Sequence, residues 1–541
     1  MSAVIPQLDP RRHDLDALRA FAMLLGIALH AAIAFIPGAG GWMIKDSQTS
    51  DFFGLFLAAI HGFRMPLFFL ISGFFTMMLY RRRGLKSLLG HRIKRIFIPM
   101  IIGLFTIIPA MWVVGAYVQS DTKVSTGELP SHDVDNIHVV AAVGDVDRLD
   151  QLLSDGVEVD LANQNRTTPL MMAVMFGQAE AAKLLVGRGA DPSKRNEFGS
   201  SASDMLELDD GTTKWVADMI GIQHDAKSIA AGRTDVAKLL PQPSDASRRL
   251  TKDGPQARKL RNKLAGAIAT LTYIPLFGHL WFLWFLCWLV VGFAIVALIG
   301  RAVRFPNLPA SLTKSSWSYA WAIPLTMIPQ AFMGTGAMNF GPDTSIGLLP
   351  MPAVLVYYAI FFGFGAMYFD AKGAAGSEVD QRMGRRWAIT IPLCLLVLFP
   401  LGIMAGEQPG GWGRFASVFA QASYVWLMSL AMIGVFRRYL SSPNRVIRYL
   451  SDSSYWLYLA HLPLVILVQS WLSDYPMSPF LKFPIVCLVT TGILLASYQC
   501  LVRYSPIGTL LNGKRRRFFE QALAVEEDPI EAKLVDAELF G

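Results

Sequence analysis

The chain has 541 residues, of which 53% are hydrophobic and 17% are charged, and its mean hydropathy is +0.39. Soluble domains average about 25% charged residues, so this composition argues against an ordinary soluble enzyme. The net charge of +8 therefore concerns orientation in a membrane, and no nucleic-acid partner is predicted.

About ten membrane-spanning helices are predicted, because the apolar runs approach the roughly 20 residues that an α-helix needs to cross a bilayer. Their centres lie near residues 26, 66, 107, 290, 327, 360, 396, 425, 463 and 491. The first run, from Leu15 to Pro37, has no small-residue cleavage pattern behind it, so we expect a retained signal anchor. All four cysteines lie inside such runs, without the spacing of a disulfide scaffold or a zinc site, and no metal site is predicted. The predicted fold is an all-α polytopic membrane helix bundle.

Lys and Arg are distributed unequally between alternate connections. The predicted short loops 38–51, 338–349, 406–413 and 473–479 contain only Lys45, whereas the loops on the other side are rich in both residue types. Cytoplasmic loops carry the excess of Lys and Arg, so both termini are predicted to lie in the cytoplasm of a bacterial cell with the protein in its inner membrane. By the same alternation the long connection 119–277 lies in the periplasm, and the apolar stretch 264–278 is expected to form an interfacial elbow.

A repeat with a period of 33 residues occurs within this connection. It relates three pairs of residues: Gly144 with Gly177, Leu152 with Leu185, and Gly156 with Gly189. The pattern resembles ankyrin repeats, whose paired helices must stack to bury their apolar faces. The segment Thr167–Ala173 matches the start-of-helix signature of that family, with Met171 where His is usual.

A third, degenerate unit is expected from Phe198 to Gln223, followed by a linker to Pro255. Two readings of the α-helical insert stay open, a protein-binding or acceptor-positioning module and a tolerated insertion, because fold alone does not decide function. The predicted division of the chain has four parts: three helices of the membrane domain in 1–118, the insert and linker in 119–255, the remaining membrane helices in 256–512, and a cytoplasmic tail in 513–541.

Ionisable residues inside predicted spans are costly and therefore indicate functional sites. Arg19 lies at the cytoplasmic end of the first span, and His30 follows 11 residues later. This separation is about 16 Å along a helix, which places His30 near the bilayer midplane. A neutral imidazole at that depth suits a general base, and a core histidine bonded to a neighbouring helix is the alternative.

Further polar residues are ranked by their expected depth. The outer half contains His61, Arg64 and His279, the middle contains His461, and the inner edge contains Arg92 and Arg95. Together they would line one path from the cytoplasm to the periplasm. Each also has a simpler reading, because inner arginines satisfy the positive-inside rule and interfacial histidines contact headgroups.

Basic residues at the inner face and a base deeper in the bilayer fit a donor that is anionic at one end and reactive at the other. Coenzyme A thioesters have this form, since guanidinium groups make forked bonds to phosphates and the pantetheine arm is long. We therefore expect Arg19, Arg92 and Arg95 to bind the donor. Acyl-CoA is the predicted co-substrate, with no bound cofactor.

Five motifs follow one another in the chain: Arg19-x10-His30, FRMPLFFLISGFF in the second span, Arg92-x-x-Arg95, HLWFLWFL opening the fourth span, and YWLYLAHLP near the end. Together they resemble the membrane-bound acyltransferase-three family, in particular its branch that modifies periplasmic glucans. The resemblance implies that His30 is the essential histidine, Arg19 its paired arginine, and Arg92 and Arg95 the donor-binding pair. The insert departs from the family, in which only a short external loop is expected.

The resemblance implies an integral membrane O-acyltransferase that moves a succinyl- or acetyl-like group from cytoplasmic acyl-CoA to a hydroxyl of an extracytoplasmic glycan or glucan. His30 would remove the hydroxyl proton, and a direct relay and an acyl-histidine are both compatible with the sequence. The candidates for acceptor binding or oxyanion stabilisation are His61, Arg64, His279, Trp281 and His461.

Trp42, Trp281 and Trp284 suit stacking on sugar rings, although interfacial aromatic belts are commoner. The expected partners are acyl-CoA, the glycan, the lipid bilayer and a protein bound through the insert. Two other function classes stay open at this point. One is a transporter or channel with histidine proton relays, and the other is a non-enzymatic membrane scaffold.

Overall fold

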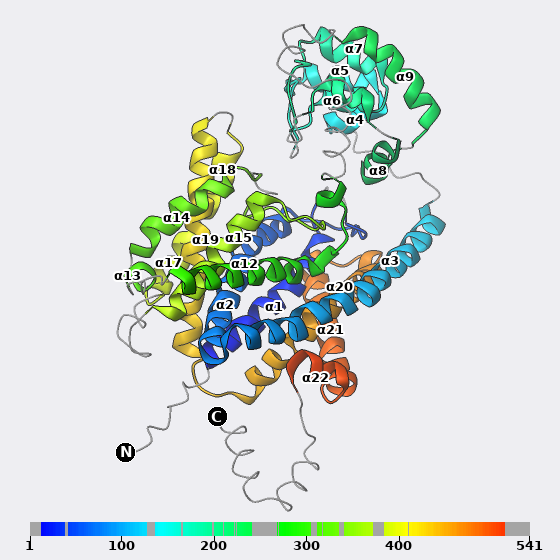
Figure 1. Cartoon of the computed structure of the whole chain (residues 1–541). Helices are drawn as coiled ribbons and strands as arrows, with labels where there is room; N and C mark the ends of the chain where they lie inside the picture. Colours follow the sequence, from blue (N-terminus) through cyan, green and yellow to red (C-terminus); the bar gives the residue numbers. More distant parts are fainter. Residues whose placement is uncertain are drawn as a thin grey trace, which may run out of the picture. The chain divides into compact units, whose positions relative to one another are not determined.

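A computed structural model describes most of the chain (Figure 1). The described residues are 12–37, 42–126, 136–163, 166–196, 200–208, 210–220, 222, 224–240, 268, 270–303, 311–315, 317–334, 340–371, 384–408 and 411–513. Throughout these ranges the regular structure is helical, with no strand. Of the predicted linker from 224 to Pro255, residues 241–255 lie outside them, as does the tail beyond Gly513. The prediction of a linker was wrong for Ala226–Leu239, which form a helix.

The chain forms two compact units: Met1–Gln119 together with Thr272–Gly541 in the first, and Ser120–Leu271 in the second. In the first unit, eight described helical stretches are long and apolar enough to cross a membrane. They are His13–Ile33, Asp51–Val118, Gly278–Val303, Pro352–Asp370, Trp387–Gly406, Gly411–Tyr439, Arg445–Ser473 and Pro479–Val502. This confirms the predicted all-α polytopic bundle.

Two features account for the difference between eight stretches and ten predicted spans. The stretch Asp51–Val118 contains two spans, because it runs through α2 (Asp51–Arg92), the π-helix η1 (Ile93–Phe97) and α3 (Ile98–Thr126). Gly84 interrupts α2 with a φ of 75°, a conformation that glycine adopts readily. The other predicted span is α14 (Trp317–Gln330), whose 14 residues extend only about 21 Å.

The direction of α14 nevertheless agrees with its being one of the membrane-spanning helices, which alternate in direction along the chain. α14 packs antiparallel to α19 (Gly411–Tyr439): the Trp426 indole donates to Thr326 Oγ1 at 2.9 Å, and Gln330 Nε2 donates to Gln421 Oε1 at 3.1 Å. Two further pairs follow the same alternation: α1 (His13–Ile33) runs parallel to α20 (Arg445–Ser473), and α2 runs parallel to α15 (Pro352–Asp370). These directions are those expected for ten successive crossings.

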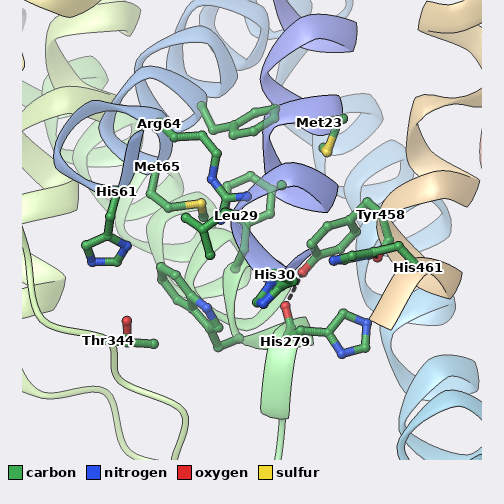
Figure 2. Close-up of a pocket in the computed structure, with 14 residues that line it drawn as sticks. Met23, Leu29, His30, His61, Arg64, Met65, His279, Thr344, Tyr458 and His461 are labelled. Carbon is green, nitrogen blue, oxygen red and sulfur yellow. Dashed lines mark hydrogen bonds between the residues drawn. The ribbon is translucent and has the colours of Figure 1, made fainter. Parts of the chain in front are cut away.

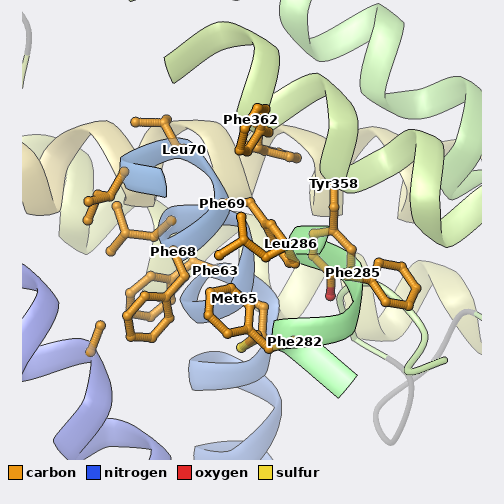
Figure 3. Close-up of a cluster of buried hydrophobic side chains, with 14 of the residues drawn as sticks. Phe63, Met65, Phe68, Phe69, Leu70, Phe282, Phe285, Leu286, Tyr358 and Phe362 are labelled. Carbon is orange, nitrogen blue, oxygen red and sulfur yellow. The ribbon is translucent and has the colours of Figure 1, made fainter. Parts of the chain in front are cut away.

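Close backbone contact joins α2 to α15. A Cβ on Gly73 would lie 1.9 Å from the carbonyl oxygen of Phe362, and a Cβ on Gly365 would lie 1.9 Å from that of Leu70. Small residues allow such contacts between membrane helices. Aromatic rings from α2, α15 and α12 (Trp281–Val303) fill the space beside them, with Phe69 4.4 Å from the ring of Tyr358 (Figure 3).

The long connection leaves and re-enters the bundle at the same end. α3 and α12 are antiparallel. A Cβ on Gly278 would lie 3.2 Å from Ile108 and a Cβ on Gly103 would lie 3.0 Å from Leu280, whereas α12, which follows these residues, packs against η1, which precedes α3. Two antiparallel helices require an even number of crossings between them. Helix is also interrupted at 274–277, just before the short 3₁₀ turn η3 (Gly278–Leu280). Both observations argue against an additional span in 264–278.

The second unit contains the predicted paired helices: α4 (Ile137–Val143) with α5 (Val146–Ser154), and α6 (Pro169–Met175) with α7 (Ala179–Gly187). The repeated glycines all have positive φ, as the turns after the helices require: Gly144 82°, Gly156 95°, Gly177 67° and Gly189 93°. The Thr168 hydroxyl caps α6 by accepting from the Met171 N–H.

A third, less regular unit follows, with the 3₁₀ helix η2 (Ala202–Glu207) and α8 (Asp210–Ile220). The additional helix α9 (Ala226–Leu239) packs so closely that a Cβ on Gly232 would lie 2.0 Å from the Gly177 carbonyl oxygen. These elements share a hydrophobic core of their own. The inserted unit is therefore built from stacked ankyrin-like helix pairs.

His138 predicts a pH dependence for the inserted unit. It is buried, and its Nε2 donates to the carbonyl oxygens of Leu161 and Thr167 at 2.8 and 3.0 Å. Burial lowers the pKa of His138 below its ordinary 6.5, although the two hydrogen bonds oppose this shift. The unfolded chain therefore binds a proton at His138 more readily than the folded unit does. The free energy of unfolding keeps its full value above pH 6.5 and decreases below it.

The measurement is hydrogen–deuterium exchange of the whole protein followed by mass spectrometry. After correction for intrinsic rates, we expect faster exchange of α4 and α6 amides at pH 5.5 than at pH 7.5. His138→Gln should flatten this dependence, because glutamine does not titrate. An equal dependence in the variant would contradict the assignment to His138.

A buried ion pair anchors segment 42–50 to α21 (Pro479–Ser497). Lys482 Nζ lies 2.8 Å from both carboxylate oxygens of Asp46, and the two side chains are 0% and 2% exposed. Removing one partner of a buried pair leaves the other charge uncompensated. We expect Lys482→Ala to lower the free energy of unfolding by about 3–5 kcal/mol. Denaturant unfolding in detergent measures this, with the exposed Lys45→Ala as the matched control; equal stability of the two variants would refute the prediction.

Candidate functional site

A cavity of about 120 Å³ lies between α1, α2, α12 and α20 (Figure 2). Its lining is Met23, Gly26, Leu29, His30, His61, Arg64, Met65, Phe68, His279, Trp281, Phe282, Thr344, Tyr458 and His461. No carboxylate is among these residues, and Arg64 supplies a permanent positive charge. The cavity is therefore polar and basic within a predominantly apolar bundle.

The structure brings together most of the residues predicted as a site. Six of them line this one cavity: His30, His61, Arg64, His279, Trp281 and His461. They come from four helical segments that are far apart in the sequence. Arg19, Arg92 and Arg95 are not among the lining residues.

His30 lies in the last turn of α1. Its ring stacks on the Trp42 indole, with centroids 5.8 Å apart and planes 10° apart, and its centroid is 5.2 Å from that of His461. α1 begins at His13, six residues before Arg19, and ends at Ile33, three residues after His30. The depth of His30 in the bilayer stays a prediction.

Three other imidazoles are held by backbone carbonyl oxygens. His61 Nε2 bonds Pro342 O at 2.8 Å, His279 Nε2 bonds Leu459 O at 3.0 Å, and His461 Nδ1 bonds Tyr458 O at 2.7 Å. A carbonyl oxygen only accepts, so each of these nitrogens carries the hydrogen. The second nitrogen of each neutral ring is then a hydrogen-bond acceptor. For His279 Nδ1 and His461 Nε2 the described residues provide no partner.

Pro463 explains why the Leu459 carbonyl oxygen is available to His279. Proline has no N–H, so the carbonyl oxygen of Leu459, four residues earlier in α20, loses its usual helical donor. His279 Nε2 occupies this vacant acceptor. The Tyr458 hydroxyl completes the link between the two segments by donating to the His279 carbonyl oxygen at 2.8 Å.

Arg64 is positioned by the absence of a side chain on α1. A Cβ on Gly26 would lie 2.5 Å from Arg64 Nη1, so the guanidinium rests directly against the helix backbone. Among the described residues Arg64 forms no ion pair, and its buried Nε has no hydrogen-bond partner. A guanidinium only donates. The cavity therefore offers donors from Arg64 and acceptors from the histidines.

The three inner arginines are held differently. Arg19 Nη2 donates to the Ser451 hydroxyl at 2.9 Å, and Arg92 Nη2 donates to the Thr76 hydroxyl at 2.7 Å. The backbone oxygen of Arg95 accepts from the Tyr455 hydroxyl at 2.7 Å. Ser451 and Tyr455 are one turn apart on α20, so Arg19 and the Arg95 backbone approach the same stretch of that helix.

One face of α1 connects Arg19 to the cavity. Arg19, Met23, Gly26 and His30 recur at intervals of three and four residues and so share a helix face. Met23 lines the cavity and is one turn from Arg19. The corresponding face of α20 carries Ser451, Tyr455, Tyr458 and His461.

Sequence reasoning missed two polar residues beside His30. Gln469 on α20 is 2% exposed and donates to the backbone oxygens of His30 and Ala31. Tyr458 lies within the predicted YWLYLAHLP motif but was not singled out. A polar side chain inside a span was the available signal for Gln469. Trp284, a predicted sugar-stacking residue, packs on Phe277 and is not part of the cavity lining.

In the described ranges, no group of three or more His, Cys, Asp or Glu side chains is arranged to hold a metal ion. The fold and the cavity define a polytopic membrane protein with a buried basic site. Comparison with protein families gives two matches. A family described as "Acyltransferase domain" matches residues 12–142 and 248–499, and one described as "Ankyrin repeats (3 copies)" matches residues 133–203.

The acyltransferase match covers more than half of the chain, so the protein belongs to this acyltransferase family and carries an inserted set of ankyrin repeats. The chain is also similar to the glucans biosynthesis protein C of Salmonella paratyphi B, Salmonella heidelberg and Salmonella schwarzengrund, with 37% identity over 114 residues. This similarity spans 21% of the chain and 29% of each of these relatives. No solved structure matches the chain.

Family membership, together with the eight apolar helical stretches, makes the protein a polytopic membrane member of this acyltransferase family. It also confirms the resemblance that the five motifs indicated. The roles of individual residues stay predictions.

Gly26→Ala tests whether the position of Arg64 matters. The new methyl group displaces the guanidinium, which is the flexible end of its side chain, so we expect little loss of stability. A displacement of about 1 Å can cost on the order of 100-fold in rate, and we expect acyl transfer to fall about 10- to 100-fold. The measurement is acyl transfer by purified protein together with its thermal unfolding.

Gly292→Ala on α12 is the matched control, because a Cβ at that position meets nothing within 4 Å. Full activity of Gly26→Ala at normal stability would show that Arg64 need not occupy this position.

Proposed function

We propose that the protein transfers an acyl group from cytoplasmic acyl-CoA to a hydroxyl of an extracytoplasmic glycan. The observation that carries this proposal is the cavity that joins His30 to Arg64, His61, His279 and His461. The partial similarity to glucans biosynthesis protein C supports a glucan as the acceptor. The proposed acyl group is succinyl- or acetyl-like.

His30 is proposed as the general base. It removes the proton from the acceptor hydroxyl as that oxygen attacks the thioester carbonyl carbon. The tetrahedral intermediate collapses, the carbon–sulfur bond breaks, and the leaving thiolate takes the proton from His30. The products are the O-acyl ester and free coenzyme A, and His30 returns to its neutral form.

Arg64 is proposed to stabilise the oxyanion of this intermediate. Its guanidinium donates hydrogen bonds without a competing carboxylate in the cavity lining, and such preorganised donors are worth most where water is excluded. The free nitrogens of His279 and His461 suit the opposite task of accepting from the hydroxyls of a sugar. His61 and Trp281 complete the proposed acceptor side of the cavity.

The donor is proposed to enter from the end of the bundle that contains Arg19, Arg92 and Arg95. Their guanidinium groups suit the phosphates of coenzyme A. The face of α1 from Arg19 to His30 is about 16 Å long, which a pantetheine arm spans. Met23 in the cavity lining supports this route.

We propose an inner-membrane location with both termini in the cytoplasm, on the grounds of the Lys and Arg distribution. The antiparallel α3 and α12 support a connection whose two ends emerge on one side, the periplasmic side in this orientation. Ankyrin repeats form extended binding surfaces, and the insert is proposed to bind a protein partner there.

His30→Ala tests the central step. General base catalysis contributes about 10²- to 10⁴-fold, so we expect acyl transfer to fall by that factor while expression and unfolding temperature stay normal. Mass spectrometry of envelope glycans, and acyl-CoA consumption by purified protein, measure the effect. His224→Ala in the inserted unit is the control, since it removes a histidine outside the cavity. Undiminished acylation by a well-expressed His30→Ala protein would end the proposal.

A further inference from the structure

The end of α1 is tied to α20 by a single buried amide. Gln469 Nε2 donates to the backbone oxygens of His30 and Ala31, both at 3.1 Å, and Gln469 Oε1 accepts from the Trp42 indole N–H at 3.0 Å. The side chain is 2% exposed. One amide group therefore contacts the backbone of His30 and the residue stacked on its ring.

The last turn of a helix has backbone oxygens without helical donors. α1 ends at Ile33, and its last turn contains His30. The usual helical donors to the two oxygens that Gln469 bonds are engaged elsewhere, since Ala34 N and Phe35 N both bond Ala32 O. Gln469 supplies the donor for two oxygens that would otherwise be left unpaired in the bundle. This anchors the turn that carries the imidazole.

Trp42 restricts the orientation of the His30 ring by stacking on it. The two planes are 10° from parallel, with centroids 5.8 Å apart. Trp42 belongs to segment 42–50, which is itself anchored: Asp46 N bonds Ala34 O, Ser50 N bonds Phe35 O, and the Asp46 carboxylate is paired with Lys482. The indole thus rests on a fixed segment, and its N–H is aimed at Gln469.

We propose that Gln469 is a positioning residue for His30, holding both the backbone of the last turn of α1 and the Trp42 indole that stacks on the imidazole. It does not touch substrate. Its effect is on the orientation of the base toward the acceptor hydroxyl, which matters in the chemical step more than in donor binding. This inference rests on the proposed function of His30.

Two substitutions at Gln469 change its three hydrogen bonds in different ways. Gln469→Leu removes all three hydrogen bonds with little change in volume. Gln469→Glu keeps an acceptor for Trp42 and places a carboxylate oxygen against the His30 and Ala31 oxygens. Since a misplacement of about 1 Å can cost on the order of 100-fold, we expect kcat to fall about 10- to 100-fold in both variants. KM for acyl-CoA should change less than about threefold, because the inner arginines are untouched.

Trp42→Phe provides a test that depends less on folding. It keeps a stacking ring and removes only the indole N–H, and we expect kcat to fall about three- to tenfold with KM for acyl-CoA unchanged. Trp456→Phe is the matched control, since it removes an indole bond of the same 3.0 Å length, from Trp456 on α20 to Ser497. In the double variant with Gln469→Leu, the two losses should be smaller than additive, because both remove one shared bond.

The outcomes distinguish the two proposals. Wild-type kcat in Gln469→Leu and Trp42→Phe, with His30→Ala inactive, would overturn the positioning role and leave the proposed function intact. Activity of His30→Ala would instead remove the proposed function itself. Should Gln469→Leu not fold, a kcat loss in Trp42→Phe that is absent from Trp456→Phe supports the inference, and equal kcat in these two variants overturns it.

Discussion

The parallel packing of α1 on α20 is the constraint on which the site depends. Arg19 bonds Ser451 at one end, and the rings of His30 and His461 lie 5.2 Å apart at the other. Since a helix repeats its side-chain directions about every 3.6 residues, this register aligns a polar face of each helix over three turns. Arg64 can then reach the backbone of α1 at Gly26, and segment 42–50 closes over the end of α1. The cavity follows from two helices held in register.

Burying one arginine and four histidines in an apolar bundle is costly, and the structure offsets this cost unevenly. His61, His279 and His461 each donate to a carbonyl oxygen, one of which is freed by a proline in α20. Buried Nδ1 of His30 and Nε of Arg64 have no partner among the described residues. Unsatisfied buried polar groups in native proteins call for an explanation, and a reaction that needs a free base and a free donor supplies one here.

The inserted repeats have a hydrophobic core of their own, and the bundle has separate ones. Each can therefore bury its apolar surface without the other. The acyltransferase match continues on both sides of the repeat match, in keeping with an insertion into one connection. Since α3 and α12 are antiparallel, a domain in that connection leaves the order of the crossings unchanged.

Apolar runs, charge asymmetry, the 33-residue repeat and the five motifs by themselves determined the all-α bundle, the ankyrin insert and the family, because each depends on patterns local to the chain. They also identified six residues that meet in one cavity, since ionisable groups are rare inside spans. The depth of His30 in the bilayer stays a prediction. Only the tertiary structure decided the hydrogen-bonded nitrogen of each histidine, the contact of Arg64 with Gly26, and the link from Gln469 to Trp42. Several of these contacts join residues far apart in the sequence, such as Trp42 with Gln469 and His279 with Leu459. Their geometry is set by helix register, which no single segment encodes.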